Sequence, residues 1–152
     1  QGSSTFWDRS TLYALRGIYI AGEADRATDV LARYARRRLT GDHVPYPIEA
    51  WPEGSQRHLA AESGLFCRVV TEGLFGIRPT GLRTFECTPS MPSGWKRMAL
   101  RHIRAFGNDF DLEVERIDND HLSLRLAVAG QPARTFRIRQ TETLQIRLPQ
   151  HP

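Results

Sequence analysis

Residues 42–58 bring carboxylate, imidazole, guanidinium and aromatic side chains together in one short stretch. The segment reads DHVPYPIEAWPEGSQRH. The residues whose side chains could take part in catalysis or binding are Asp42, His43, Tyr46, Glu49, Trp51, Glu53, Arg57 and His58. Carboxyl groups can transfer protons at a glycosidic bond. Aromatic rings offer a flat apolar face to pyranose C–H groups and a polar edge to hydroxyls. We therefore expect a loop that handles a sugar, since functional residues concentrate on loops held by a rigid scaffold.

Two glutamates are the candidates for a catalytic carboxylate. Glu49 lies between Ile48 and Trp51, where partial removal from water would make it a stronger base; its other interpretation is a loop carboxylate that caps a turn. Glu62 lies inside an apolar helical pattern, four residues after His58. A buried carboxylate must be paired or functional, so Glu62 either acts on the substrate or forms a structural pair with His58 or an arginine.

The remaining polar residues of the segment could bind hydroxyls or an anion. His43 and His58 could hydrogen-bond sugar hydroxyls or phosphate. Arg57 and His58 stand at a predicted helix start, where free N–H groups favour an anion; their other interpretation is simple surface charge. Glu53 has two interpretations, a carboxylate favoured by the helix dipole or a sugar ligand.

Three aromatic residues could form platforms for a sugar ring. Tyr46 and Trp51 fit either this role or packing at the mouth of a helical barrel, and Trp7 either lines the opposite wall or packs onto the first helix. No spacing of histidine, cysteine or carboxylate ligands is typical of a metal site. We therefore expect neither a metal nor a cofactor.

The composition is that of a soluble globular protein. The chain has 152 residues, of which 40% are hydrophobic and 25% charged, enough for one domain or two small ones. The net charge of +4 comes from scattered arginines, and we interpret the run at 36–38 as a solvated helix end, so no nucleic-acid partner is expected. No stretch could span a bilayer, so no membrane partner is expected, and the compartment stays open between cytoplasm and periplasm or secretion. Cys67 and Cys87 are expected to be buried free thiols.

The periodicity changes once along the chain. Apolar residues recur at helical spacing in residues 8–21, 24–41 and 55–74. The short link at residues 22–23 predicts an antiparallel hairpin of the first two helices. The third helix is apolar nearly all round, which is typical of a helix covered on every side. We therefore expect a missing portion or a partner chain to complete its surroundings.

Residues 82–148 alternate between apolar and polar side chains, which predicts six short antiparallel strands. A change of phase at residues 102–103 predicts a β-bulge. Helices followed by strands indicate an α+β fold, with three helices leading into a small β-sandwich.

Three passages carry a resemblance to a known group of enzymes. They read EGLFGIRPTGL at 72–82, TPSMPSGW at 88–95 and LRHIRAFG at 100–107. Together with the order of hairpin, polar loop, apolar helix and strands, this resembles the C-terminal end of six-hairpin glycosidases, the (α/α)6-barrel clan of glucoamylases and disaccharide phosphorylases. The resemblance implies that residues 1–76 are the last helices of an incomplete catalytic barrel, and that residues 77–152 are a C-terminal antiparallel β-sandwich.

The resemblance also implies a function. The loop before the last barrel helix carries the general base in the glucoamylase branch, and Glu49 matches that position best, with the general acid in an earlier hairpin outside this chain. The expectation is a fragment of an inverting glycoside hydrolase, inactive alone, that needs a carbohydrate substrate and the rest of the barrel. The alternatives are a glycoside phosphorylase fragment, with phosphate bound near Arg57 and His58, or a non-catalytic carbohydrate-binding or interaction module.

Overall fold

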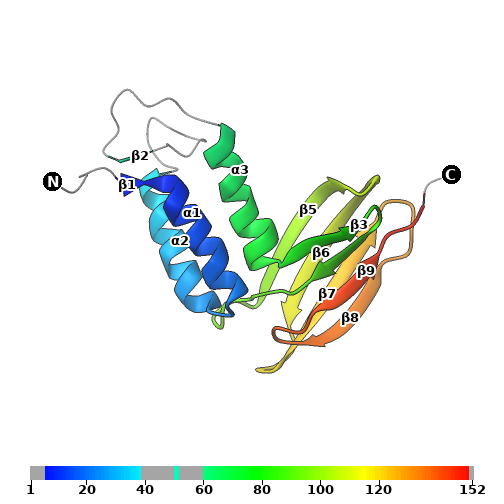
Figure 1. The fold of residues 1–152 in the computed structure, drawn as a ribbon. Coiled ribbons are helices and arrows are strands. Elements are labelled where there is room, and N and C mark those ends of the chain that lie inside the picture. The colour runs from blue at the N-terminus through cyan, green and yellow to red at the C-terminus, as the bar shows by residue number, and fades with distance from the viewer. Residues whose placement is uncertain (1–5, 39–49, 52–59, 151–152) are drawn as a thin grey trace. The chain divides into compact units, whose positions relative to one another are not determined.

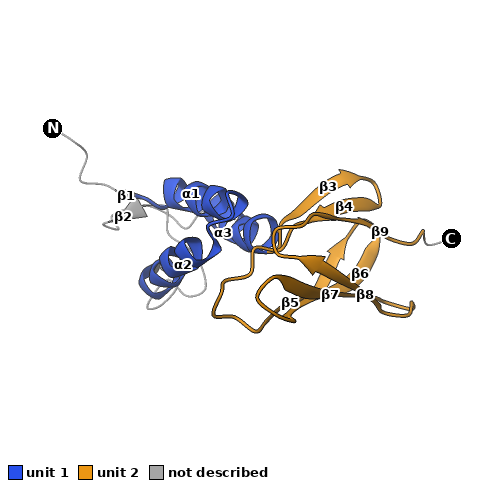
Figure 2. Ribbon diagram, turned by 90° about the horizontal axis from the view of Figure 1, so that it is seen from below, with its two compact units in different colours: residues 1–74 blue, residues 75–152 orange. Residues whose placement is uncertain are grey.

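The computed structural model describes residues 6–38, 50–51 and 60–150. The chain divides into two compact units, residues 1–74 and residues 75–152 (Figure 2). The change of periodicity in the sequence, placed after Gly76, lies close to this division.

Unit 1 is helical, and three helices lie where the sequence predicts helices (Figure 1). They are α1 (Asp8–Ile20), α2 (Ala24–Arg38) and α3 (Ala60–Arg68), the last continuing as a π-helix, η1 (Val69–Leu74). The two-residue turn after Ala21 makes α1 and α2 antiparallel neighbours. The predicted start of the third helix near residue 55 and the predicted end of the second near residue 41 lie outside the described residues.

The core of unit 1 forms where α1 lies against its neighbours. Its buried apolar side chains are Leu12, Leu15, Tyr19, Ala27, Tyr34, Leu65, Val69 and Leu74. Gly73 allows η1 to approach α1 closely, because a Cβ at this position would lie 3.0 Å from Cδ2 of Tyr19. The prediction of a buried Cys67 is wrong: this thiol is exposed, together with Ala61 and Gly64. The reason is geometric, since α3 buries only the face that meets α1 and α2.

A two-stranded ribbon, not predicted from the sequence, joins the start of α1 to the polar segment. Strand β1 (Phe6–Trp7) pairs antiparallel with β2 (Ala50–Trp51), with Phe6 opposite Trp51 and Trp7 opposite Ala50. The backbone at residues 50–51 is thereby held beside the first turn of α1.

Unit 2 consists of two antiparallel sheets, so the chain as a whole is α+β. One sheet has the order β3-β4-β9, with β3 (Ile77–Gly81), β4 (Thr84–Cys87) and β9 (Leu144–Arg147). The other has the order β5-β6-β7-β8, with β5 (Arg97–Ala105), β6 (Asn108–Arg116), β7 (His121–Val128) and β8 (Arg134–Arg139). The sequence predicted six of these strands and missed β3.

The alternating residues of unit 2 face a common apolar core. Phe110, Leu112 and Val114 of β6 are buried, as are the alternate residues of β7. The ring of Phe85 on β4 stacks on that of Phe110, with 5.7 Å between centroids. Because Phe85 and Phe110 belong to different sheets, this stacking joins the two sheets through their side chains.

The predicted bulge in β5 is confirmed. The register with β6 shifts between Leu100 and Ile103, and His102 takes a left-handed conformation with φ +54°. The backbone N–H of His102 donates to Oδ1 of Asp111 at 2.8 Å, which supplies a partner for an amide displaced from the ladder. This hydrogen bond is also the largest influence that lowers the pKa of the Asp111 carboxyl.

Candidate functional site

Most of the predicted site lies outside the described residues. This holds for His43, Tyr46, Glu49, Glu53, Arg57 and His58. Only the backbone of Trp51 is described, in β2. Glu62 and Trp7 are therefore the candidate site residues whose side chains the structure places.

Glu62 stands in the first turn of α3, and its side chain is 0% exposed. Its Oε1 accepts two hydrogen bonds from Arg9 of α1, from Nε at 2.9 Å and from Nη2 at 2.7 Å. Of the two partners expected for a buried Glu62, His58 or an arginine, the structure shows an arginine. Among residues 6–38, 50–51 and 60–150, Oε2 of Glu62 has no hydrogen-bond partner. A buried carboxylate oxygen normally has a hydrogen-bond partner, from the protein, from water or from a ligand.

A second buried carboxylate lies at the same end of the helices. Asp8 is the first residue of α1 and is 0% exposed. Its Oδ2 accepts a hydrogen bond from the hydroxyl of Tyr34, near the end of α2, at 3.3 Å. The ring of Tyr34 stacks on Phe66 of α3, with centroids 6.2 Å apart. All three helices therefore contribute to one group of side chains, which we call the carboxylate cluster: Asp8, Arg9, Tyr34 and Glu62.

Sequence reasoning missed Asp8 and Arg9 as members of a site. An aspartate in the first turn of a helix is common, because the helix dipole favours it there, so the residue type gave no distinguishing signal. Arg9 is 53 residues from Glu62 along the chain. Only the fold brings these two side chains together.

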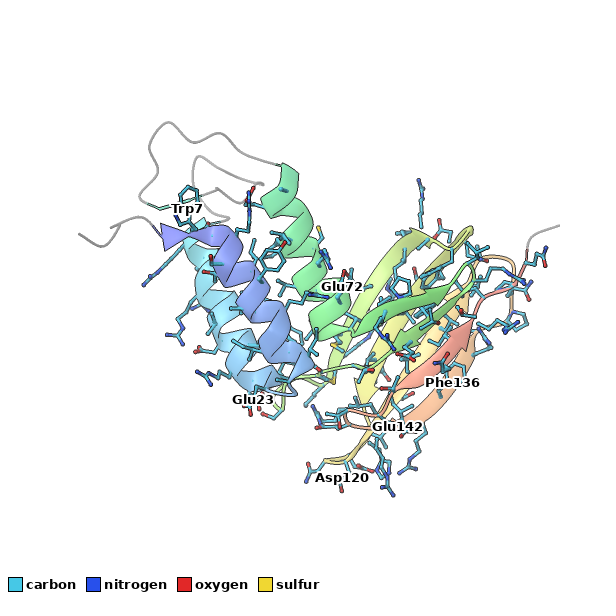
Figure 3. The ribbon with its side chains drawn as sticks, in the orientation of Figure 1. Trp7, Glu23, Glu72, Asp120, Phe136 and Glu142 are labelled. Carbon is cyan, nitrogen blue, oxygen red and sulfur yellow. The ribbon has the colours of Figure 1, made fainter. Side chains whose placement is uncertain are left out.

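Trp7 adds an aromatic side chain to this end of unit 1. It precedes the first turn of α1 (Figure 3) and is 48% exposed. Its side chain makes no capping hydrogen bond to the helix. About half of the Trp7 side chain is therefore open to solvent next to Asp8.

Glu72, in η1, has a different environment (Figure 3). Its Oε1 accepts from Nε of Arg68 at 2.5 Å, and its Oε2 accepts from Nη2 of Arg68 at 3.1 Å and from Nε of Arg16 at 2.6 Å. The hydrogen bond from Arg68 is the main reason why the pKa of Glu72 is lowered, followed by the opposing effect of burial and by the charge of Arg16. Both oxygens are in use, which is typical of a structural ion pair.

Two other kinds of feature are absent from the described residues. No three of their histidine, cysteine and carboxylate side chains come together as metal ligands. None of the described helices combines the length and the apolar character that a bilayer crossing needs.

Comparison of the chain with protein families, curated proteins and solved structures gives no match.

Proposed function

We propose that this chain is the C-terminal part of a glycoside hydrolase, in which unit 1 supplies the last helices of an (α/α)6 catalytic barrel and unit 2 a β-sandwich. The observation that carries the proposal is the carboxylate cluster at one end of the helices. Residues 39–49 leave the end of α2, and residues 52–59 enter the start of α3. The polar segment is thus joined to unit 1 at the same end as Asp8 and Glu62, and its residues 50–51 pair with the strand that contains Trp7.

The proposed reaction is inverting hydrolysis, with Glu49 as general base. The carboxylate of Glu49 takes a proton from water while the water oxygen bonds to the anomeric carbon. The glycosidic C–O bond breaks, and a carboxylic acid from an earlier part of the barrel protonates the leaving oxygen. Such a pair stands about 6.5–9.5 Å apart, so that the water fits between the carboxyl groups.

Glu62 is better suited to hold the substrate than to move a proton. Two hydrogen bonds from Arg9 fix the orientation of its carboxylate, and Oε2 remains to accept a hydrogen bond from a sugar hydroxyl. A fixed acceptor of this kind favours one position of the sugar ring. Glu62 stays the alternative base if Glu49 has no such role.

The phosphorylase alternative requires a cation for the phosphate group. Arg57 and His58 were predicted for that role, and both lie outside the described residues. Arg9, in the first turn of α1, already binds Glu62. The dependence of the reaction on phosphate is the measurement that separates the two alternatives.

The test uses the whole polypeptide that contains residues 1–152, assayed for release of sugar from a panel of disaccharides and oligosaccharides. Glu49→Gln should lower kcat by about 100-fold or more, the contribution of a general base. Glu23→Gln is the matched control, because Glu23 is exposed in the α1–α2 turn (Figure 3) and should leave kcat unchanged. Turnover of Glu49→Gln near that of the wild type would reject Glu49 as the base.

Two further outcomes separate the alternatives. Release of a sugar phosphate only in the presence of phosphate would replace hydrolysis with phosphorolysis. Sugar binding by the whole polypeptide without any cleavage would instead support a non-catalytic carbohydrate-binding module.

A further inference from the structure

Unit 2 contains a pocket of about 460 Å³ that the proposed hydrolysis does not use. It lies between the turn that follows β7 and the segment that follows β9. Its apolar walls come from Val128, Pro132, Leu148 and Pro149. The volume is within the range of about 300–1,000 Å³ that is typical of small-molecule sites.

The segment that forms one wall is fixed by hydrogen bonds. The backbone N–H of Leu148 donates to the carbonyl oxygen of Arg83 at 2.9 Å. Nδ2 of Asn108, a buried side chain, donates to the carbonyl oxygen of Pro149 at 3.3 Å. This wall of the pocket is therefore in place before a ligand arrives, which lowers the entropic cost of binding.

Two arginines line this pocket, Arg134 of β8 and Arg147 of β9. Nη2 of Arg134 donates to the carbonyl oxygen of Arg147 at 2.9 Å, and the guanidinium lies over the ring of Phe136, 5.8 Å from its centroid. These contacts hold the Arg134 guanidinium in place while its other N–H groups remain for a ligand. No aspartate or glutamate is among the described residues that line the pocket.

Apolar walls with two cations and no lining carboxylate define the ligand by its chemistry. A guanidinium binds a carboxylate through paired, charge-assisted hydrogen bonds. Two proline rings and two aliphatic side chains offer contact to a flat apolar body. A small hydrophilic anion would leave these walls without a partner, and a neutral apolar molecule would leave the guanidinium groups without one.

We propose that this pocket binds a small aromatic carboxylic acid, with the carboxylate held by Arg134 and Arg147 and the ring against Pro132, Leu148 and Pro149. The site is built within unit 2 alone. The proposal is therefore independent of the hydrolytic function assigned to unit 1.

The test is an NMR titration of the ¹⁵N-labelled 152-residue chain with 2-naphthoate, alongside 2-naphthamide as a neutral molecule of the same shape. Naphthoate should shift the amide signals of residues 128–134 and 147–149 and bind at least about ten-fold more tightly than the amide, the contribution expected of one charge-assisted hydrogen bond. Arg134→Gln and Arg147→Gln should each weaken naphthoate binding by a similar factor and leave naphthamide unchanged.

Arg125→Gln is the matched control, since Arg125 is an exposed arginine of β7 that does not line the pocket; its affinity should stay at the wild-type value. Arg134→Lys should bind with intermediate affinity, because it keeps the charge and loses the planar fork. If Arg134→Gln does not fold, Arg147→Gln carries the test. Equal binding of acid and amide, undiminished naphthoate binding in the glutamine variants, or no binding at millimolar naphthoate would overturn the proposal.

Discussion

Removal of Arg9 should destabilise unit 1 more than neutralisation of its partner Glu62. The two side chains are unequally exposed, at 47% for Arg9 and 0% for Glu62. Arg9→Met leaves the carboxylate of Glu62 within the protein without its cation. Glu62→Gln leaves a guanidinium that water already reaches.

The magnitude follows from this asymmetry. Removing one partner of a fully buried pair costs about 3–5 kcal/mol. Because solvent screens the exposed half of Arg9, we expect about 2–3 kcal/mol for Arg9→Met. Glu62→Gln keeps an acceptor oxygen for Arg9 and loses only the charge assistance, so we expect about 1 kcal/mol. The double variant Arg9→Met/Glu62→Gln has no buried charge without a partner, so it should be more stable than Arg9→Met alone.

Unfolding in urea, followed by tryptophan fluorescence, measures these differences. The chain has three tryptophans, and a Trp95→Phe background leaves only Trp7 and Trp51, both in unit 1. Arg33→Met is the control, because its ion pair with Asp29 is 64% exposed on both sides and should contribute less than about 0.5 kcal/mol. Two results would contradict this explanation: an equal loss of unfolding free energy in Glu62→Gln and Arg9→Met, or a double variant less stable than Arg9→Met. Either would show that the unpaired carboxylate of Glu62 does not cause the loss of stability in Arg9→Met.

Three further predictions concern single residues. Gly76 has φ +62°, and a Cβ there would lie 2.1 Å from a backbone carbonyl oxygen, so Gly76→Ala should cost at least about 3 kcal/mol of unfolding free energy. Gly107 has φ +70° with open space around it, so Gly107→Ala should cost only about 1 kcal/mol; equal losses in thermal unfolding would contradict the steric explanation. Burial raises the pKa of Cys87 to about 12. A disulfide reagent at pH 8 should therefore modify only the exposed Cys67 in the folded chain, and both thiols in urea. Modification of both thiols in the folded chain would show that Cys87 is accessible. The pKa of Glu72 is lowered on folding, so its contribution to stability is complete above the ordinary glutamate range and disappears as the pH falls through the lower folded value. Urea midpoints measured at falling pH should therefore decline less steeply in Glu72→Gln than in the wild type, and parallel curves would count against this linkage.

Strands with one buried face could be predicted from the sequence, and a strand without one could not. In β6, buried Phe110, Leu112 and Val114 alternate with side chains that are not buried, so the two-residue period is visible in the residue types. Strand β3 lies at the edge of its sheet. Its residues beyond Ile77 are all exposed, and its register shifts between Pro79 and Gly81. No apolar alternation marks such a strand, and proline argues against one.

A member of the candidate site could be predicted from the sequence only where its side chain does not fit the residues around it, as with a carboxylate in an apolar helix. Glu62 was identified because a carboxylate within an apolar helix needs a partner. Its partner Arg9 and the neighbouring Asp8 gave no local signal, since a charged first turn is ordinary for a helix. The ribbon of β1 and β2 is two residues long on each side, too short for any period. Contacts between distant segments decide these features.

The third helix and its π-helical continuation contain two glutamates, and their different environments make the one at the start of α3 the better candidate for the proposed function. Arginines bind both oxygens of Glu72, so this carboxylate has little capacity left for a ligand. Glu62 is the more buried of the two, and its Oε2 has no partner among the described residues. A protein does not keep a buried acceptor oxygen unpartnered without cost. The partner of this oxygen comes from the segment joined to this end of the helices, from water or, under the proposed function, from a bound sugar, and a sugar bound there would lie beside Trp7 and Asp8 rather than at η1.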